Sequence, residues 1–192
     1  MSEKFSNILL LGDSHLSRNS GDAGESLILL FKKSFPDTII QNLAKGGADT
    51  RYGKSILSQH HIILPTLALV LFGTNDAASW KQVPLQEFSE NYADIISKLK
   101  SDNVSSIILI TPPPVNQKKQ TPPGRSDTDI HQYAQEVINL ANKYQLDCLD
   151  LYSLLKSVMI KEDIHYRDGV HLNERGYIIF FNALCDLITK KP

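Results

Sequence analysis

Short apolar runs and longer amphipathic segments alternate along this chain. The apolar runs lie at residues 7–11, 38–41, 67–72, 104–110 and 146–150. Each run is apolar on successive residues rather than on every second one, which is typical of strands covered on both faces of a sheet. We therefore expect five short strands that are buried on both sides.

The segments between the runs carry apolar residues at helical spacing. Phe88, Tyr92, Ile95 and Leu99 follow one another at intervals of three or four, and Pro84 suits the first turn of that helix. Related patterns mark further helices near residues 27–31, 130–144 and 177–188. Strands that alternate with helices predict an α/β fold in which helices cover both faces of a parallel sheet. A length of 192 residues predicts a single domain over 1–192.

Composition narrows the possible partners and cofactors. The net charge is -1, with acidic and basic residues interspersed, so we expect no nucleic-acid partner. Cys148 and Cys185 are too few for a disulfide framework or a four-ligand zinc site, and we expect neither a metal nor another cofactor. The most apolar stretch, 62–72, is too short for a membrane span, and residues 1–7 do not resemble a signal peptide. These features predict a cytoplasmic protein.

A serine follows the first predicted strand in the sequence Gly12-Asp13-Ser14-His15. Glycine allows a tight exit from the strand, and a serine on the turn before a helix lies at the mouth of the crevice with its own amide free to bind an anion. A serine before a helix is also a common N-cap, so this motif alone leaves both interpretations open.

Two further polar motifs follow the second and third strands. Gly46-Gly47 lies in the segment 42–50, where a glycine amide can approach and donate to an oxyanion, or can simply form a turn. Asn75 lies in Gly73-Thr74-Asn75-Asp76, where its side-chain amide can point into the crevice or form an Asx-turn.

The last motif is Asp168-Gly169-Val170-His171, which precedes the final helix. An aspartate three residues before a histidine can bind its Nδ1–H and leave Nε2 free to face a serine. The carboxyl ends of parallel strands share one edge, so we predict that Ser14 is a nucleophile, His171 its base and Asp168 the residue that orients the base. The Ser14 and Gly47 amides and the Asn75 side chain are the predicted oxyanion donors. The Gly-x-Ser-x-Gly elbow of α/β-hydrolases is absent.

These four motifs resemble the blocks of the GDSL, or SGNH, hydrolase family, in order from Gly12 to Gly176. Thr50-Arg51, the segment 111–114 and the segment 168–172 are similar to its branch of isoamyl acetate-hydrolysing esterases. The resemblance implies a flavodoxin-like sandwich with five parallel strands, and metal-independent hydrolysis of short-chain acyl esters through an acyl-enzyme. The chain departs from the family pattern at His15, where Leu or Ile is usual, and at Ala44, where Gly is common.

Other candidate residues concern the substrate, a small-molecule ester. His15, Arg51 and His165 are predicted to contact it. The segment 112–129, called the proline-rich loop below, contains five prolines and is either a wall or lid of the site or a solvated excursion. Alternatives on the same scaffold are a carbohydrate O-deacetylase and a lysophospholipase or thioesterase. A non-catalytic alternative is a flavodoxin-like binding module.

Overall fold

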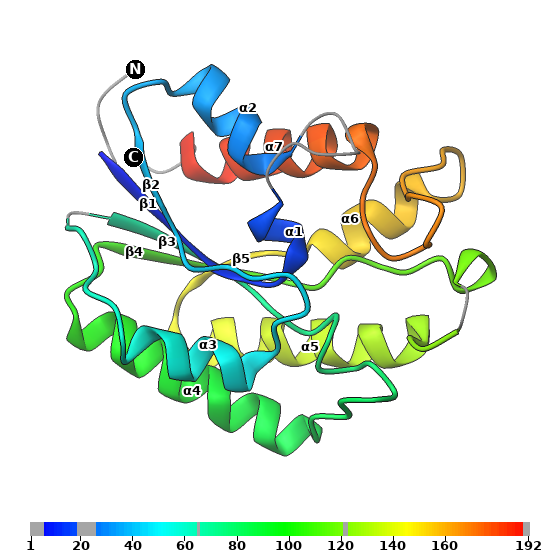
Figure 1. Cartoon of the computed structure of the whole chain (residues 1–192), viewed down its shortest axis with the longest axis horizontal. Helices are drawn as coiled ribbons and strands as arrows, with labels where there is room; N and C mark the ends of the chain where they lie inside the picture. Colours follow the sequence, from blue (N-terminus) through cyan, green and yellow to red (C-terminus); the bar gives the residue numbers. More distant parts are fainter. Residues whose placement is uncertain (1–5, 19–25, 65, 121–122, 190–192) are drawn as a thin grey trace.

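A five-stranded parallel sheet forms the middle layer of the protein (Figure 1). The computed structural model describes residues 6–18, 26–64, 66–120 and 123–189. The strands lie in the order β2-β1-β3-β4-β5, and every neighbouring pair is parallel. The elements are β1 (Asn7–Gly12), α1 (Ser14–Ser17), α2 (Leu27–Ser34), β2 (Ile39–Asn42), α3 (Thr50–Leu57), β3 (Thr66–Leu71), α4 (Leu85–Ser101), β4 (Ser106–Ile110), the short 3₁₀ helix η1 (Gln117–Lys119), α5 (Asp127–Tyr144), β5 (Asp147–Leu149), α6 (Leu151–Val158) and α7 (Glu174–Thr189).

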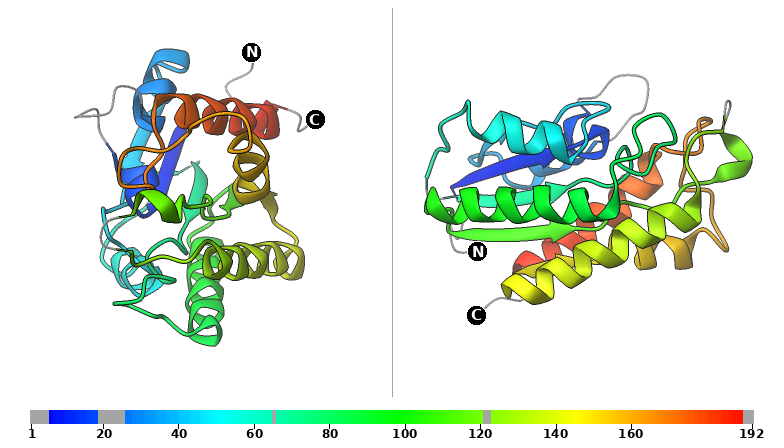
Figure 2. Two further views of the ribbon diagram at one scale, coloured as in Figure 1. Left: turned by 90° about the vertical axis from the view of Figure 1, so that its right-hand side faces the viewer. Right: turned by 90° about the horizontal axis from the view of Figure 1, so that it is seen from below.

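Two hydrophobic cores lie on opposite faces of this sheet. Successive strand side chains point to opposite faces, so Leu9 belongs to one core and Leu10 to the other. The first core includes residues of α3, α4 and α5, and the second includes residues of α2, α6 and α7. Figure 2 shows α4 and α5 crossing one face of the sheet in the view from below. The predicted α/β sandwich with three layers and five parallel strands is thereby confirmed.

Burial on both faces holds for the inner strands and fails at the two edges. All six residues of β1 and of β3 are buried, whereas β2 and β5 contain no buried residue. An edge strand has a neighbour on one side only, and short edge strands are common in natural sheets. The expectation that all five strands are fully covered was therefore wrong for β2 and β5.

The apolar periodicity of the sequence did not predict the helices α3 and α6. α3 and α6 have only eight residues each, and each begins after an aspartate that accepts a hydrogen bond from its first turn. Asp49 caps α3, and Asp150 caps α6. In the part of the chain that the structure describes, no helix has both the length and the apolar character to cross a bilayer.

Close packing of β1 against β3 brings the first and third motifs together. A Cβ atom on Gly12 would lie 2.4 Å from the Leu71 carbonyl oxygen, so only glycine fits this position. The Asp13 amide then donates to the same carbonyl at 3.2 Å. The turn that carries Ser14 consequently starts beside the turn that follows β3.

The proline-rich loop packs against the carboxyl edge of the sheet. Its residues 112–115 are buried, and residues 121 and 122 lie outside the described residues. The Asn116 amide donates to the Gly169 carbonyl at 2.7 Å, and the Ser79 amide donates to the Gly124 carbonyl at 2.9 Å. The described parts of the loop are thus hydrogen-bonded both to the turn before α7 and to the segment after β3. The interpretation as a solvated excursion is wrong for residues 112–115.

Candidate active site

Ser14, His171 and Asp168 form one hydrogen-bonded chain at the carboxyl edge of the sheet. His171 Nε2 lies 2.9 Å from Ser14 Oγ, and His171 Nδ1 lies 2.6 Å from Asp168 Oδ2. Neutral imidazole carries one ring proton, so a carboxylate at Nδ1 holds that proton there and leaves Nε2 as the acceptor. This arrangement can remove a proton from the serine hydroxyl.

The turn before α7 fixes the Asp168 carboxylate. Its second oxygen, Oδ1, accepts the amides of Val170 and His171, both at 2.9 Å. Gly169 lies between Asp168 and Val170 and has a φ of 68°, the left-handed conformation that glycine adopts readily. Burial acts to raise the pKa of Asp168, but hydrogen bonds from the His171 ring and from the two amides outweigh burial and lower the pKa to about 2. Asp168 is therefore ionised at neutral pH.

Asp13 and His15 are buried on either side of Ser14 in the sequence. Asp13 Oδ1 accepts the His15 amide at 2.8 Å and so caps α1. This contact gives Asp13 a structural role in the turn that carries Ser14. Burial raises the pKa of the Asp13 carboxyl to about 7, although the His15 amide and the Thr74 side chain oppose the shift. The centroid of the His15 ring lies 5.8 Å from that of the His171 ring. The pKa of His15 is held well below its usual value, mainly by burial and secondly by the nearby His171. His15 has no exposed surface for a substrate to reach.

Three donors lie in the loops around Ser14. Among the described residues, the backbone amides of Ser14 and Gly47 donate no hydrogen bond. Gly47 has a φ of 76°, and the space where a side chain would stand is open. Asn75 is buried, and its Nδ2 donates to the Ala48 carbonyl at 2.9 Å, which leaves one N–H of that amide unassigned. Amides of this kind can stabilise a developing oxyanion.

Buried Asp76 joins the loops that carry Gly47 and Asn75. Its Oδ1 accepts both the Thr50 amide, at 2.9 Å, and the Thr50 hydroxyl, at 2.6 Å. Its Oδ2 accepts the Gly73 amide at 3.1 Å. Burial raises the pKa of Asp76 to about 6, against the effect of the Thr50 hydrogen bonds. The sequence does not reveal this bridge, because no local pattern indicates that an aspartate pairs with a threonine 26 residues away.

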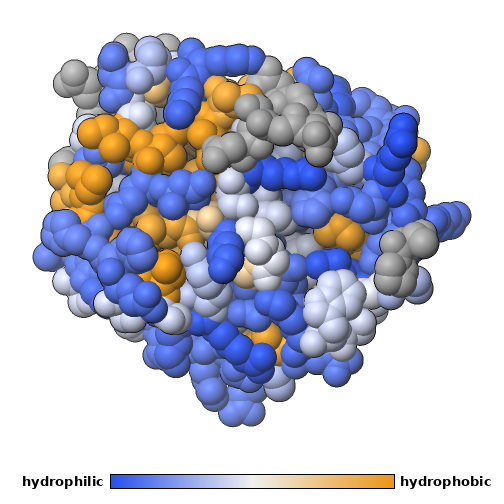
Figure 3. All heavy atoms as spheres, viewed as in Figure 1, coloured by the Kyte–Doolittle hydropathy of each residue, from blue (hydrophilic) through white to orange (hydrophobic). Residues whose placement is uncertain are grey.

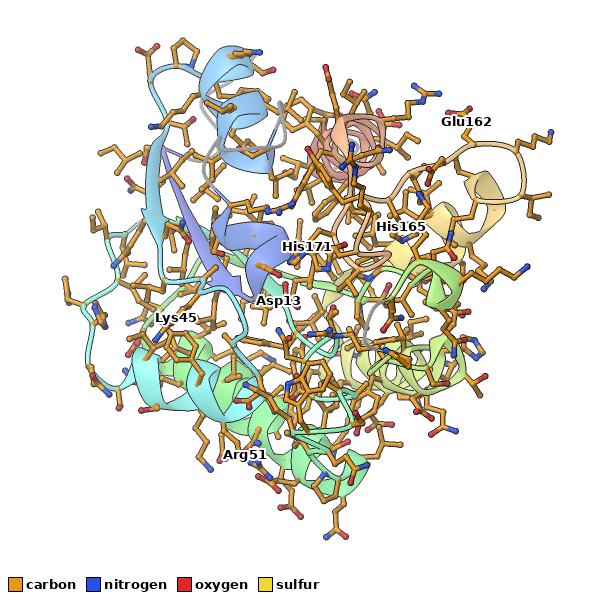
Figure 4. The ribbon with its side chains drawn as sticks, turned by 45° about the vertical axis from the view of Figure 1, so that its right-hand side comes forward. Asp13, Lys45, Arg51, Glu162, His165 and His171 are labelled. Carbon is orange, nitrogen blue, oxygen red and sulfur yellow. The ribbon has the colours of Figure 1, made fainter. Side chains whose placement is uncertain are left out.

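The other two predicted substrate contacts, Arg51 and His165, have partners within the protein. Arg51 is on α3 and forms a two-pronged ion pair with Glu87, at 2.5 and 2.8 Å; Figure 4 shows it well away from His171. His165 is buried, and its Nε2 lies 2.8 Å from the Pro114 carbonyl oxygen of the proline-rich loop. In this structure, then, Arg51 and His165 contact other parts of the protein.

One further residue contacts the site and was also missed. Arg125 in the proline-rich loop donates from Nη2 to Asn75 Oδ1 at 2.8 Å. The sequence indicates only that its loop leaves the carboxyl edge of the sheet. Within the described residues, no three histidine, cysteine, aspartate or glutamate side chains are grouped so that they could hold a metal ion.

The fold defines an α/β sandwich protein with polar residues gathered at the carboxyl edge of its parallel sheet. The chain matches the GDSL-like Lipase/Acylhydrolase family over residues 10–179 and belongs to that family. It is accordingly a carboxylic ester hydrolase.

Known relatives and solved structures agree with this assignment. The chain is 29% identical to an isoamyl acetate-hydrolyzing esterase 1 homolog from Mus musculus, over 96% of this chain and 82% of the relative. It is 28% identical to a GDSL esterase/lipase from Arabidopsis thaliana, over 92% of this chain and 83% of the relative. The crystal structure of a lipase/acylhydrolase from Enterococcus faecalis superposes with a TM-score of 0.81 at 24% identity, and covers 95% of this chain and 94% of that one. A catalytic mutant of an acetylxylan esterase from Geobacillus stearothermophilus gives a TM-score of 0.75 at 20% identity, over 96% and 94% of the two chains.

Proposed function

We propose that this protein hydrolyses short-chain acyl esters through an acyl-enzyme formed on Ser14. The observation that carries the proposal is the continuous chain from Ser14 Oγ through His171 to Asp168, with contacts of 2.9 and 2.6 Å. Similarity to an esterase named for isoamyl acetate favours an acetyl-sized acyl group.

In the first half of the reaction, Ser14 Oγ attacks the ester carbonyl carbon while His171 Nε2 takes the hydroxyl proton. Asp168 keeps the other ring proton on Nδ1 and stabilises the imidazolium. The Ser14 and Gly47 amides and Asn75 Nδ2 donate to the oxyanion. The carbon–oxygen bond to the alcohol then breaks, and His171 gives its proton to the departing alcohol oxygen.

In the second half, water attacks the acyl-serine ester and His171 takes a proton from that water. Collapse of the second tetrahedral intermediate releases the carboxylic acid and returns the proton to Ser14 Oγ. Every proton moves through one imidazole, so the side chains and backbone amides of the protein provide all the groups that this cycle needs.

The test is a series of p-nitrophenyl esters from acetate upward, assayed with the wild type, Ser14→Ala and Ser17→Ala. Ser17 lies on the same short helix and is a matched control. We expect kcat to fall by about 10⁴-fold or more in Ser14→Ala, the size seen for other serine nucleophiles, and to change little in Ser17→Ala. A reactive phosphonate should transfer its phosphonyl group to Ser14 Oγ with loss of its leaving group, and mass spectrometry should find that added group on Ser14. Retained activity in Ser14→Ala, or labelling at another residue, would refute the proposal.

A carbohydrate O-deacetylase is a second candidate, because a pocket that contains Arg125 offers several polar side chains. This pocket of about 480 Å³ is lined by Gln82, Gln117, Arg125, Asp129 and Gln132, together with apolar residues such as Val83 and Tyr133. Arg125 connects it to Asn75 through their hydrogen bond. The face in Figure 3 is likewise mostly polar on its right, toward the carboxyl ends of the strands, while apolar side chains gather on its left. Amide, guanidinium and carboxylate side chains beside apolar ones can bind the hydroxyls and the carbon face of a sugar, whereas the acyl tail of a lysophospholipid or thioester would need an apolar lining. Release of acetate from an acetylated oligosaccharide, at a higher kcat/KM than from p-nitrophenyl acetate, would favour this substrate.

A further inference from the structure

Arg125 grips the turn that carries Asn75 with two parallel hydrogen bonds. Its Nε donates to the Thr74 carbonyl at 2.9 Å, and its Nη2 donates to Asn75 Oδ1 at 2.8 Å. The guanidinium also lies over the Trp80 ring, 4.7 Å from its centroid. A planar fork held in this way fixes direction as well as distance, which a lysine could not do.

The partners of Asn75 permit only one orientation of its side-chain amide. Guanidinium is a donor only, so it must face the amide oxygen. The Ala48 carbonyl is an acceptor only, so it must face the amide nitrogen, which it does at 2.9 Å. Rotation of the amide by 180° would oppose donor to donor at Arg125 and acceptor to acceptor at Ala48. A charge-assisted bond to the oxygen also draws electron density from the nitrogen, which strengthens the remaining N–H as a donor.

Arg125 is itself held by the proline-rich loop. The buried Gln120 side chain accepts the Arg125 amide at 3.0 Å and donates to the Arg125 carbonyl at 2.9 Å. Gly124 packs so closely on Trp80 that a Cβ atom there would lie 2.0 Å from the indole ring. These contacts place the guanidinium before any substrate arrives, as expected of a group that supports a reacting residue.

We propose that Arg125 is a positioning residue, which acts through Asn75 by holding the amide so that Nδ2–H faces the oxyanion. This inference rests on the proposed function, in which Asn75 is an oxyanion donor. Beyond that function, we expect Arg125 to increase kcat through its effect on the Asn75 side chain. Charge alone is a separate possibility, because the Asp13 and Asp168 carboxylates also interact with the guanidinium.

A double-mutant cycle separates these effects. The variants are Arg125→Ala, Asn75→Ala and the double variant, with kcat and KM for p-nitrophenyl acetate measured separately. We expect Asn75→Ala to lower kcat by about 10²–10³-fold. Arg125→Ala should lower kcat by about 10–10²-fold and change KM less than threefold, because the hydrogen bond from Asn75 Nδ2 to the oxyanion, which it weakens, exists only in the transition state. In the Asn75→Ala background, removal of Arg125 should lower kcat by less than about threefold.

Arg125→Lys tests whether the charge or the fork matters. The ammonium keeps the charge near Asp13 and Asp168 but cannot span the Thr74 and Asn75 oxygens as the guanidinium does. We expect kcat of Arg125→Lys to stay within threefold of Arg125→Ala. If Arg125→Ala does not fold, the same cycle is run with Arg125→Lys. Arg175→Ala is the matched control, since Arg175 pairs with Glu162 on the surface and should leave kcat unchanged.

The possible outcomes distinguish this inference from the proposed function. Equal losses from Arg125→Ala with and without Asn75, wild-type kcat in Arg125→Ala, or full recovery in Arg125→Lys would each overturn the positioning role. None of these results bears on Ser14 as nucleophile. Conversely, activity that survives Ser14→Ala would overturn the proposed function, whatever the cycle gives.

Discussion

Replacement of Asp168 by asparagine should abolish most activity while the fold survives. Asparagine has the shape of aspartate but offers only one acceptor oxygen, whereas the Asp168 carboxylate accepts three hydrogen bonds. Oδ1 accepts the amides of Val170 and His171, and Oδ2 accepts the His171 ring at 2.6 Å. The single oxygen of asparagine can therefore accept either from the two backbone amides or from the imidazole, but not from both.

The backbone should win this competition. Two amide hydrogen bonds at about 1 kcal/mol each favour the orientation with the oxygen toward Val170 by about 2 kcal/mol, which is roughly a 30-fold preference. The asparagine NH₂ then faces His171 Nδ1, so the ring proton moves to Nε2 and the base toward Ser14 is lost. Loss of the charge that stabilises the imidazolium adds to this effect, and together they predict a fall in kcat of about 10³–10⁴-fold.

The assay is kcat for p-nitrophenyl acetate at neutral pH, together with thermal unfolding of each variant. Asp150→Asn is the matched control, because Asp150 directly follows β5 and caps α6, a role that asparagine fills equally well. We expect both variants to melt near the wild type and only Asp168→Asn to lose activity. A loss below tenfold in folded Asp168→Asn, or an equal loss in Asp150→Asn, would refute the reasoning.

Two further predictions concern stability. Burial raises the pKa of Asp13 from 3.8 to about 7 in the folded protein. The folded state therefore binds this proton more tightly than the unfolded state. The resulting stabilisation is complete below pH 3.8 and is lost as the pH rises through about 7. Asp13→Asn, which stays neutral and still accepts the His15 amide, should raise Tm more at pH 8 than at pH 5; an equal effect at both pH values would contradict the buried ionisation. Gly169→Ala should lower the free energy of unfolding by about 1–2 kcal/mol or more and reduce kcat, because φ is 68° and the new Cβ would lie 2.3 Å from the Asn116 carbonyl oxygen. Urea unfolding beside Gly46→Ala, where the added Cβ meets no atom within 4 Å, provides the comparison, and equal stabilities would show that the strain is absent.

Much of the fold could be predicted because strand burial leaves a local signature. The inner strands β1, β3 and β4 are apolar on successive residues, since helices cover both of their faces. The long helices α4 and α5 repeat apolar residues over four or five turns. In contrast, α3 and α6 are too short for periodicity to stand out, although Asp49 and Asp150 mark their starts.

The motifs of Ser14, Gly47 and Asn75 were predictable neighbours, because each follows a strand and parallel strands end at one edge. The Asp168–His171 motif follows α6 instead, so its contact with Ser14 was suggested by the chemistry of the residues and depends on the tertiary structure. The sequence could not show which polar residues near that edge face Ser14. Arg51 follows the Gly47 motif directly, yet it points to Glu87 on α4. His15 neighbours Ser14, yet the turn of α1 directs its ring into the protein.

The sequence by itself determined the alternation of strands and helices and the edge at which the polar motifs gather, because hydrophobic periodicity and strand ends are local properties of the chain. Only the tertiary structure decided the strand order, the edge strands and the partners of individual side chains. Arg125 and Asn75 are 50 residues apart, and their contact depends on how the proline-rich loop packs over the sheet. Such a contact leaves no periodic trace in the sequence, since it arises from the packing of whole elements.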